Sequence, residues 1–64
     1  MQRFKMGDRI LILSRYAHLY PDDSGLIVAV KLDSFRDKFN EYTIRFSDGS
    51  TANIFEFQLV EAAV

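Results

Sequence analysis

His18 and the two acids that follow it are the residues whose types could support catalysis. His18 is the chain's one histidine, and a histidine acts as a general base when a carboxylate holds it or a nucleophile stands beside it. Asp22 and Asp23 are near in sequence, but no nucleophile motif surrounds His18. The three glycines each fall at an expected bend, so they form no phosphate-binding loop. We therefore predict no catalytic residues and no enzyme activity for the chain acting alone.

The segment from Asp22 to Gly25 brings together two carboxylates and a hydroxyl, which are ligands that calcium prefers. A calcium site needs about six to eight oxygens at defined spacing, and this segment supplies too few. We expect a turn instead, in which the Asp and Ser side chains bond their own backbone. The chain has no cysteine, which excludes disulfides and thiolate metal sites and favours a reducing, cytoplasmic location. The prediction is no metal and no cofactor.

Aromatic residues in the expected connections between strands are the more informative group. They are Tyr16, Tyr20, Phe35 and Phe39. An exposed ring face attracts a cation or stacks on a peptide, so these rings predict a groove or cage that binds a protein or peptide segment. Asp22 and Asp23 would add negative charge that suits a basic partner. The alternative is that the rings cap the ends of the fold and bury apolar area.

Cations near these rings give an alternative function, an RNA- or ribosome-associated module. The residues that would contact phosphates are Arg15, Arg36, Lys38 and Arg45. Aromatic residues that alternate with cations are typical of single-stranded nucleic-acid binding. The net charge of −1 and the interleaved acids weigh against it, because phosphate contacts usually need a basic excess. Arg45 could equally pair with an acid on a neighbouring strand.

Five short β-strands are expected to position these residues. Apolar and β-branched runs, with alternation clearest at residues 41–47, predict strands at residues 8–14, 25–32, 41–47, 50–54 and 59–61. Asp48-Gly49 predicts a tight hairpin between the third and fourth strands. Ser34 could cap one helical turn in the interval 33–40, and residues 55–58 could form one 3₁₀ turn.

The predicted fold is therefore one all-β domain, a small five-stranded barrel. The 64 residues allow one domain, which we place at residues 7–61 between an N-terminal arm (1–6) and a C-terminal tail (62–64). The opening methionine favours a whole protein. The first apolar run, residues 10–13, is too short for a signal peptide or a spanning helix, so no membrane is expected. The alternation predicts a core of Ile10, Ile12, Leu26, Val28, Val30, Tyr42, Ile44, Phe46, Ala52, Ile54 and Leu59.

Four segments of this chain resemble the SH3-like small barrels of the Tudor and KOW kinds. They are residues 6–10 (MGDRI), 25–28 (GLIV), 42–49 (YTIRFSDG) and 57–60 (FQLV), and the resemblance spans residues 6–61. It implies a five-stranded barrel, but such barrels serve as peptide binders, methyl-lysine readers, RNA-binding modules and docks for redox partners. It therefore implies a fold and leaves the function among those classes.

The chain also has a weaker similarity to the plasmid-type dihydrofolate reductases, which are small barrels that open with a similar Gly-Asp-Arg strand. Their activity would imply a lysine late in the first strand, where this chain has Ile12 and Leu13. Their Gln-Ile-Tyr segment corresponds here to Asn53, Ile54 and Phe55, so an amide is present and the hydroxyl is missing. An oligomeric reductase is therefore the second alternative. The sequence leaves the oligomeric state open.

Overall fold

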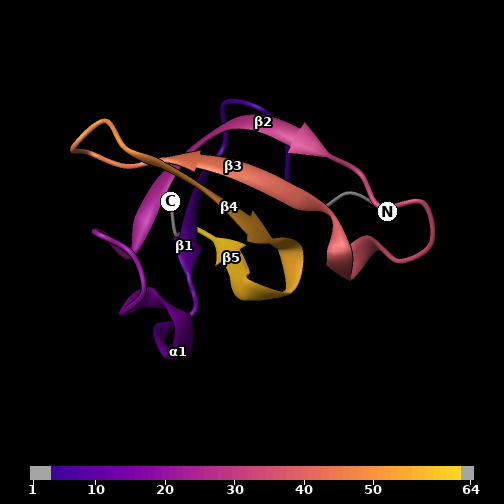
Figure 1. The fold of residues 1–64 in the computed structure, drawn as a ribbon, viewed down its shortest axis with the longest axis horizontal. Coiled ribbons are helices and arrows are strands. Elements are labelled where there is room, and N and C mark those ends of the chain that lie inside the picture. The colour runs from indigo at the N-terminus through magenta and orange to yellow at the C-terminus, as the bar shows by residue number, and fades with distance from the viewer. Residues whose placement is uncertain (1–3, 63–64) are drawn as a thin grey trace.

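The protein forms one five-stranded antiparallel sheet that curls around a single core (Figure 1). The computed structural model describes residues 4–62. The strands follow the order β4-β3-β2-β1-β5 across the sheet. Their bounds are β1 (Arg9–Ile12), β2 (Ser24–Lys31), β3 (Glu41–Arg45), β4 (Thr51–Phe55) and β5 (Leu59–Glu61). The predicted all-β class with five short strands is confirmed, and each predicted strand overlaps an observed one.

The sheet does not close into a barrel. Strand β4 pairs only with β3 and strand β5 pairs only with β1 within the described residues, so both are edge strands. The 3₁₀ turn η2 (Glu56–Gln58) carries the chain from one edge to the other without a ladder between them. The side-chain amide oxygen of Gln58 accepts a 3.1 Å hydrogen bond from the Phe55 backbone N–H, which holds this turn in place. The predicted 3₁₀ turn is thus present, and it takes the place of barrel closure.

A β-bulge in β2 corrects the predicted inward face of that strand. Ile27 pairs with Ile44 and Ala29 with Thr43, so Val28 is an extra residue that shifts the register. Before the bulge, Ile27 points into the core and Leu26 points outward, where it is half-buried. Leu26 was predicted to be in the core, and that prediction is wrong. Val28, which was also predicted to be in the core, is only half-buried. The prediction assumed a simple alternation along β2, and such an alternation does not continue across an inserted residue.

The core contains seven of the predicted residues, which are Ile10, Ile12, Tyr42, Ile44, Phe46, Ile54 and Leu59. Val30 and Ala52 pack against this cluster and are partly buried. The sequence missed Ile27 and Phe4. Phe4 lies in the interval expected to be an N-terminal arm, yet only 2% of it is exposed, and its ring meets Tyr42 edge-on at a centroid distance of 5.6 Å. Residues 1–3 of that arm and residues 63–64 of the predicted tail lie outside the described residues.

The connections before β2 and before β3 each contain one short turn of helix, and the second lies in the interval 33–40, where one helical turn was predicted. Helix α1 (Ser14–Ala17) follows β1, and the 3₁₀ turn η1 (Asp37–Phe39) precedes β3. Ser34 does not cap this turn. The Asp33 carboxylate instead accepts hydrogen bonds from the backbone N–H groups of Phe35 and Arg36, at 2.9 and 2.8 Å. These backbone bonds also hold the pKa of the Asp33 carboxyl below its usual value.

The hairpin between β3 and β4 has its turn where Asp48-Gly49 predicts it. Gly49 has a φ of +88°, a conformation that glycine adopts without strain. The Asp48 carboxylate accepts hydrogen bonds from the Ser50 hydroxyl and the Ser50 backbone N–H, at 2.5 and 2.9 Å, and these bonds hold the pKa of that carboxyl below its usual value. No helix among residues 4–62 is long and apolar enough to cross a membrane.

Candidate functional site

Two buried polar residues, Asn40 and Glu56, are hydrogen-bonded to each other at one end of the sheet. Asn40 is 1% exposed and Glu56 is 3% exposed. The backbone N–H of Glu56 donates to the Asn40 carbonyl at 2.8 Å, and Asn40 Nδ2 lies 3.4 Å from Glu56 Oε1. Asn40 Oδ1 also accepts a 2.8 Å bond from the Asp33 backbone N–H. These bonds fix the β2–β3 connection against the turn η2.

Tyr42 completes this buried network from strand β3. Its hydroxyl donates a 2.7 Å hydrogen bond to Glu56 Oε1. Burial, followed by this bond and the negative charge of the Glu56 carboxylate, raises the pKa of Tyr42 to about 12. No buried side-chain nitrogen or oxygen among the described residues lacks a hydrogen-bond partner. The network is therefore fully satisfied, which is the condition under which buried polar groups specify one geometry.

The burial of Asn40 and Glu56 places three phenylalanines on the surface. Phe39 precedes Asn40, while Phe55 and Phe57 flank Glu56, and their exposed fractions are 40%, 38% and 40%. Phe55 and Phe57 stack with centroids 5.7 Å apart and an angle of 11° between their planes. Phe39 meets both edge-on, at 6.1 Å each. A carboxylate is thus buried between two exposed rings, which inverts the usual distribution of charged and apolar side chains.

Tyr16 extends this cluster from helix α1. Its ring is half-buried and meets Phe57 edge-on at 6.2 Å. We call Tyr16, Phe39, Phe55 and Phe57 together the aromatic surface. The Arg15 guanidinium lies 5.7 Å from the centroid of the Tyr16 ring, and Lys38 Nζ lies 5.2 Å from the centroid of the Phe39 ring. Both cations are within the distance at which a ring face attracts positive charge.

A small cavity of about 150 Å³ opens beside Phe39 and Phe55. Its lining residues are Lys31, Leu32, Asp33, Phe39, Glu41 and Phe55. Two rings and an exposed aliphatic side chain give it apolar walls, while the carboxylates of Asp33 and Glu41 outweigh the single ammonium of Lys31. The pKa of the Asp33 carboxyl is lowered by the backbone N–H groups of Arg36 and Phe35, so this carboxyl keeps its charge to more acidic pH than an ordinary one. The cavity therefore combines ring faces with a net negative charge.

The structure separates the ring residues that were predicted to form one site. Tyr16 and Phe39 belong to the aromatic surface. Tyr20 instead stacks on the buried Phe46, with centroids 5.9 Å apart, and both Tyr16 and Tyr20 are partly buried against the core. Phe35 lies in the β2–β3 connection with 92% of its surface exposed and has no ring contact in residues 4–62.

The predicted acids also lie apart from the aromatic surface. Asp22 accepts a hydrogen bond from the Ser47 hydroxyl at 2.5 Å, so it bridges to the hairpin end of the sheet. Asp23 is exposed, and its backbone carbonyl accepts a 2.7 Å bond from the Ile12 N–H. His18 is exposed at the end of helix α1. Asp33 and Glu41 are the carboxylates that the fold places beside the rings.

Of the four cations predicted to contact phosphates, two lie at the aromatic surface and two lie elsewhere. Arg15 and Lys38 lie over rings of the aromatic surface, whereas Arg36 is exposed in the β2–β3 connection. Arg45 projects from the outer face of β3, where its cross-strand neighbours are Leu26 and Thr51 rather than an acid.

Residues 53–55, the segment compared above with the reductases, lie in strand β4. The Thr43 hydroxyl donates a 2.8 Å hydrogen bond to Asn53 Oδ1, and the side chain of Ile54 is fully buried. Phe55 belongs to the aromatic surface. The amide that the resemblance implies is thus held by a neighbouring strand.

Sequence reasoning missed Phe55 and Phe57 as site residues, although it expected the turn that contains them. The available signal was the pattern of residues 55–57, in which one acid separates two phenylalanines at a strand end. Under simple alternation, both rings are exposed only if the acid between them faces the core. The buried residues that bond this acid are 14 and 16 residues away in sequence, so the local pattern does not show that it faces inward. The chain has no match among protein-family models, curated proteins or solved structures.

Proposed function

We propose that this chain is a non-enzymatic binding module that docks a protein segment on its aromatic surface. The observation that carries this proposal is the inverted burial at residues 55–57, where Glu56 is 3% exposed and the two phenylalanines are 38% and 40% exposed. A fold that only needed to bury apolar area would turn those rings inward. Contiguous exposed rings on a rigid framework are typical of protein-binding surfaces, in which a few aromatic anchors contribute most of the affinity.

The preferred partner is a segment with a basic side chain among apolar ones. The cavity beside Phe39 and Phe55 offers ring faces and the carboxylates of Asp33 and Glu41, which together favour a lysine or arginine. Lys38 already lies over the face of the Phe39 ring, so a cation of the partner would have to displace it there. The apolar side chains of the partner would then contact Phe57 and Tyr16.

A titration with two matched peptides tests the proposal. One peptide carries Leu-Lys-Leu-Phe at its centre and the other carries Leu-Glu-Leu-Phe, and binding is followed by NMR on the isotope-labelled chain. We expect the lysine peptide to bind more tightly and to shift the amides of residues 39–41 and 55–57. Phe39→Ala should weaken its binding about tenfold or more, since truncating an aromatic anchor typically has that effect.

Phe35→Ala is the matched control, because Phe35 is more exposed than any ring of the aromatic surface and is outside it. The Phe35→Ala variant should bind the lysine peptide as tightly as the unaltered chain does. Tighter binding of the glutamate peptide would overturn the basic partner. Equal effects of the two alanine variants, or shifts confined to other residues, would overturn the aromatic surface as the docking site.

Single-stranded nucleic acid is a second candidate ligand for the same rings. It is favoured by Arg15 over Tyr16 and Lys38 over Phe39, since bases stack on exposed rings while cations contact the backbone. A short RNA should then bind with an affinity that falls steeply as salt concentration rises. An affinity that does not change with salt concentration would show that the chain makes no phosphate contacts, and it would overturn nucleic acid as the ligand.

A further inference from the structure

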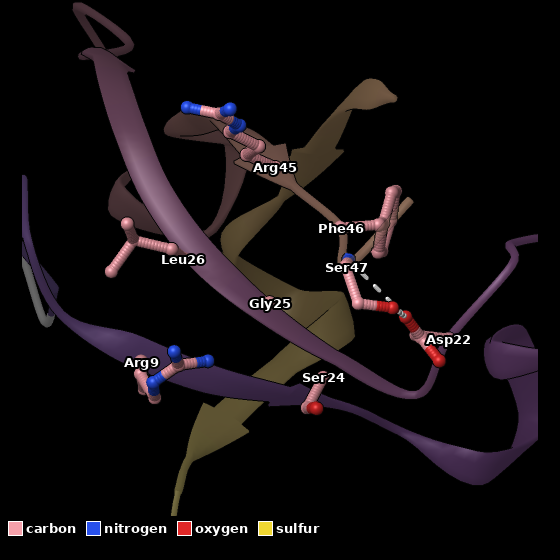
Figure 2. A pocket seen from close by; sticks show the side chains of 8 residues that line it. All are labelled: Arg9, Asp22, Ser24, Gly25, Leu26, Arg45, Phe46 and Ser47. Atoms are coloured by element: carbon pink, nitrogen blue, oxygen red, sulfur yellow. Dashed lines mark hydrogen bonds between the residues drawn. The ribbon is translucent and has the colours of Figure 1, made fainter. Parts of the chain in front are cut away.

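A second cavity lies on the outer face of the sheet, between two arginines (Figure 2). Its volume is about 350 Å³, and Arg9, Asp22, Ser24, Gly25, Leu26, Arg45, Phe46 and Ser47 line it. The lining comes from β1, β2, the last residue of β3 and the start of the β3–β4 connection, with one contribution from the turn before β2. No residue of the aromatic surface lines it, so this cavity is independent of the proposed docking site.

Strand register places the two arginines in one row across the sheet. Arg9 pairs with Leu26, and Leu26 pairs with Arg45. Directly opposed residues project from the same face, and adjacent strands lie about 4.8 Å apart, so the two arginine backbones are about 10 Å apart. Both side chains are long enough to reach a ligand over Leu26 from opposite sides. Figure 2 shows both side chains on this face, with Leu26 and Gly25 between them.

Both guanidinium groups remain available to a ligand. Neither the Arg9 nor the Arg45 side chain forms a hydrogen bond or ion pair within the part of the chain that the structure describes. Asp22 is the one acid in the lining, and its carboxylate already accepts bonds from the Ser47 hydroxyl and backbone N–H, at 2.5 and 3.4 Å. The lining therefore carries two positive charges and one negative charge.

Two further acids lie near Arg9, but neither neutralises its charge through an ion pair. Arg9 also borders a hollow that contains Asp8 and Glu61. Asp8 forms an ion pair with Lys5 at 3.3 Å, and Glu61 makes no ion pair with Arg9. The chain thus has a net charge of −1 but concentrates two unpaired arginines at this one cavity.

We infer that this cavity binds the phosphate group of a small molecule, a function separate from docking on the aromatic surface. Each guanidinium presents a fork of N–H donors that matches phosphate oxygens. Ser24, two residues before Leu26 on β2, adds a hydroxyl to the same lining. A planar carboxylate is fully bound by a single guanidinium. Several donors that approach from different directions therefore fit the oxygens of a phosphate better than they fit a carboxylate. Asp22 limits the charge that the site accepts.

Titration of the labelled chain with inorganic pyrophosphate, with AMP and with citrate tests the inference. We expect saturable shifts at residues 24–26 and 45–47 with pyrophosphate and AMP, and much weaker shifts with citrate. Arg9→Gln and Arg45→Gln should each weaken pyrophosphate binding about three- to tenfold, because an exposed charged hydrogen bond contributes less than a buried one. Asp22→Asn should strengthen it, since the variant removes the one negative charge of the lining.

Arg36→Gln is the matched control, because it removes the same charge from an exposed arginine that does not line the cavity. Its affinity should equal that of the unaltered chain. An equal loss in all three arginine variants would mean nonspecific attraction and would overturn the site. So would citrate binding as tightly as pyrophosphate. A short oligo-dT that binds at these residues while pyrophosphate and AMP do not would overturn the assignment to a small molecule.

Discussion

The Tyr42 hydroxyl and the Glu56 carboxylate are joined by a 2.7 Å hydrogen bond inside the core, across 14 residues of sequence. This bond connects strand β3 to the turn η2 and thereby determines which side chains of residues 55–57 face outward. The aromatic surface is therefore a consequence of a buried polar contact. Stability of the core and presentation of the rings depend on the same atoms.

Tyr42→Phe should lower the free energy of unfolding by about 1–3 kcal/mol, because it removes the hydroxyl that donates a 2.7 Å hydrogen bond to the buried Glu56 carboxylate. Urea denaturation measures the change. Tyr16→Phe is the matched control, since the Tyr16 ring is only half-buried and its hydroxyl has no hydrogen bond within residues 4–62. We expect the control to differ from the unaltered chain by about 0.5 kcal/mol or less. Equal losses in both variants would contradict a special role for the Tyr42–Glu56 bond.

Stability should fall at alkaline pH because of Tyr42. Its pKa is raised from 10.0 to about 12 in the folded chain, so the folded state holds the proton more tightly than the unfolded state. The resulting stabilisation is fully present below pH 10 and is lost as pH rises from 10 to about 12, by at most about 3 kcal/mol. Denaturation curves at a series of alkaline pH values measure it. Tyr42→Phe should remove this part of the pH dependence, and a variant that kept it would contradict the assignment.

Gly25→Ala should destabilise the fold by about 1–3 kcal/mol. A Cβ at this position would lie 2.3 Å from Ile44 Cγ2 and 2.9 Å from the Arg45 carbonyl oxygen, so strand β3 would have to move. Ala29→Ser, at an exposed position of the same strand, is the control and should have little effect. Thermal unfolding compares the two. A Gly25→Ala variant as stable as the control would mean that β2 and β3 are not packed this closely.

Phe4→Ala should destabilise the protein by about 3–5 kcal/mol, the usual loss for a buried ring. A domain of 64 residues has roughly 3–10 kcal/mol of stability in total, so this variant should be largely unfolded or close to it. Circular dichroism with urea denaturation measures this. Phe4→Leu keeps most of the volume and should retain the fold. A stable Phe4→Ala variant would show that the segment before β1 is not part of the core.

Phe57→Ser should cost only about 1 kcal/mol, since much of this ring faces solvent and only its contacts with neighbouring rings are lost. The same urea series that measures Phe4→Ala gives the comparison. A loss as large as that of Phe4→Ala would mean that the ring is needed for folding. The aromatic surface would then be an extension of the core.

The local pattern determined most of the fold of this chain. Alternation at Tyr42, Ile44 and Phe46 predicted β3 and its inward face, and Asp48-Gly49 predicted the hairpin, because both signals depend on neighbours a few residues apart. The same reasoning placed Leu26 in the core, since a bulge at Val28 leaves no local mark in the sequence.

Tertiary structure alone decided the candidate sites. Glu56 is buried because Tyr42 and Asn40, 14 and 16 residues away, supply its hydrogen bonds, and that burial turns Phe55 and Phe57 outward. Arg9 and Arg45 became neighbours of one cavity only through the register of three strands. Side-chain periodicity specifies which residues share a face of a strand, whereas the partners on that face depend on pairing between distant segments.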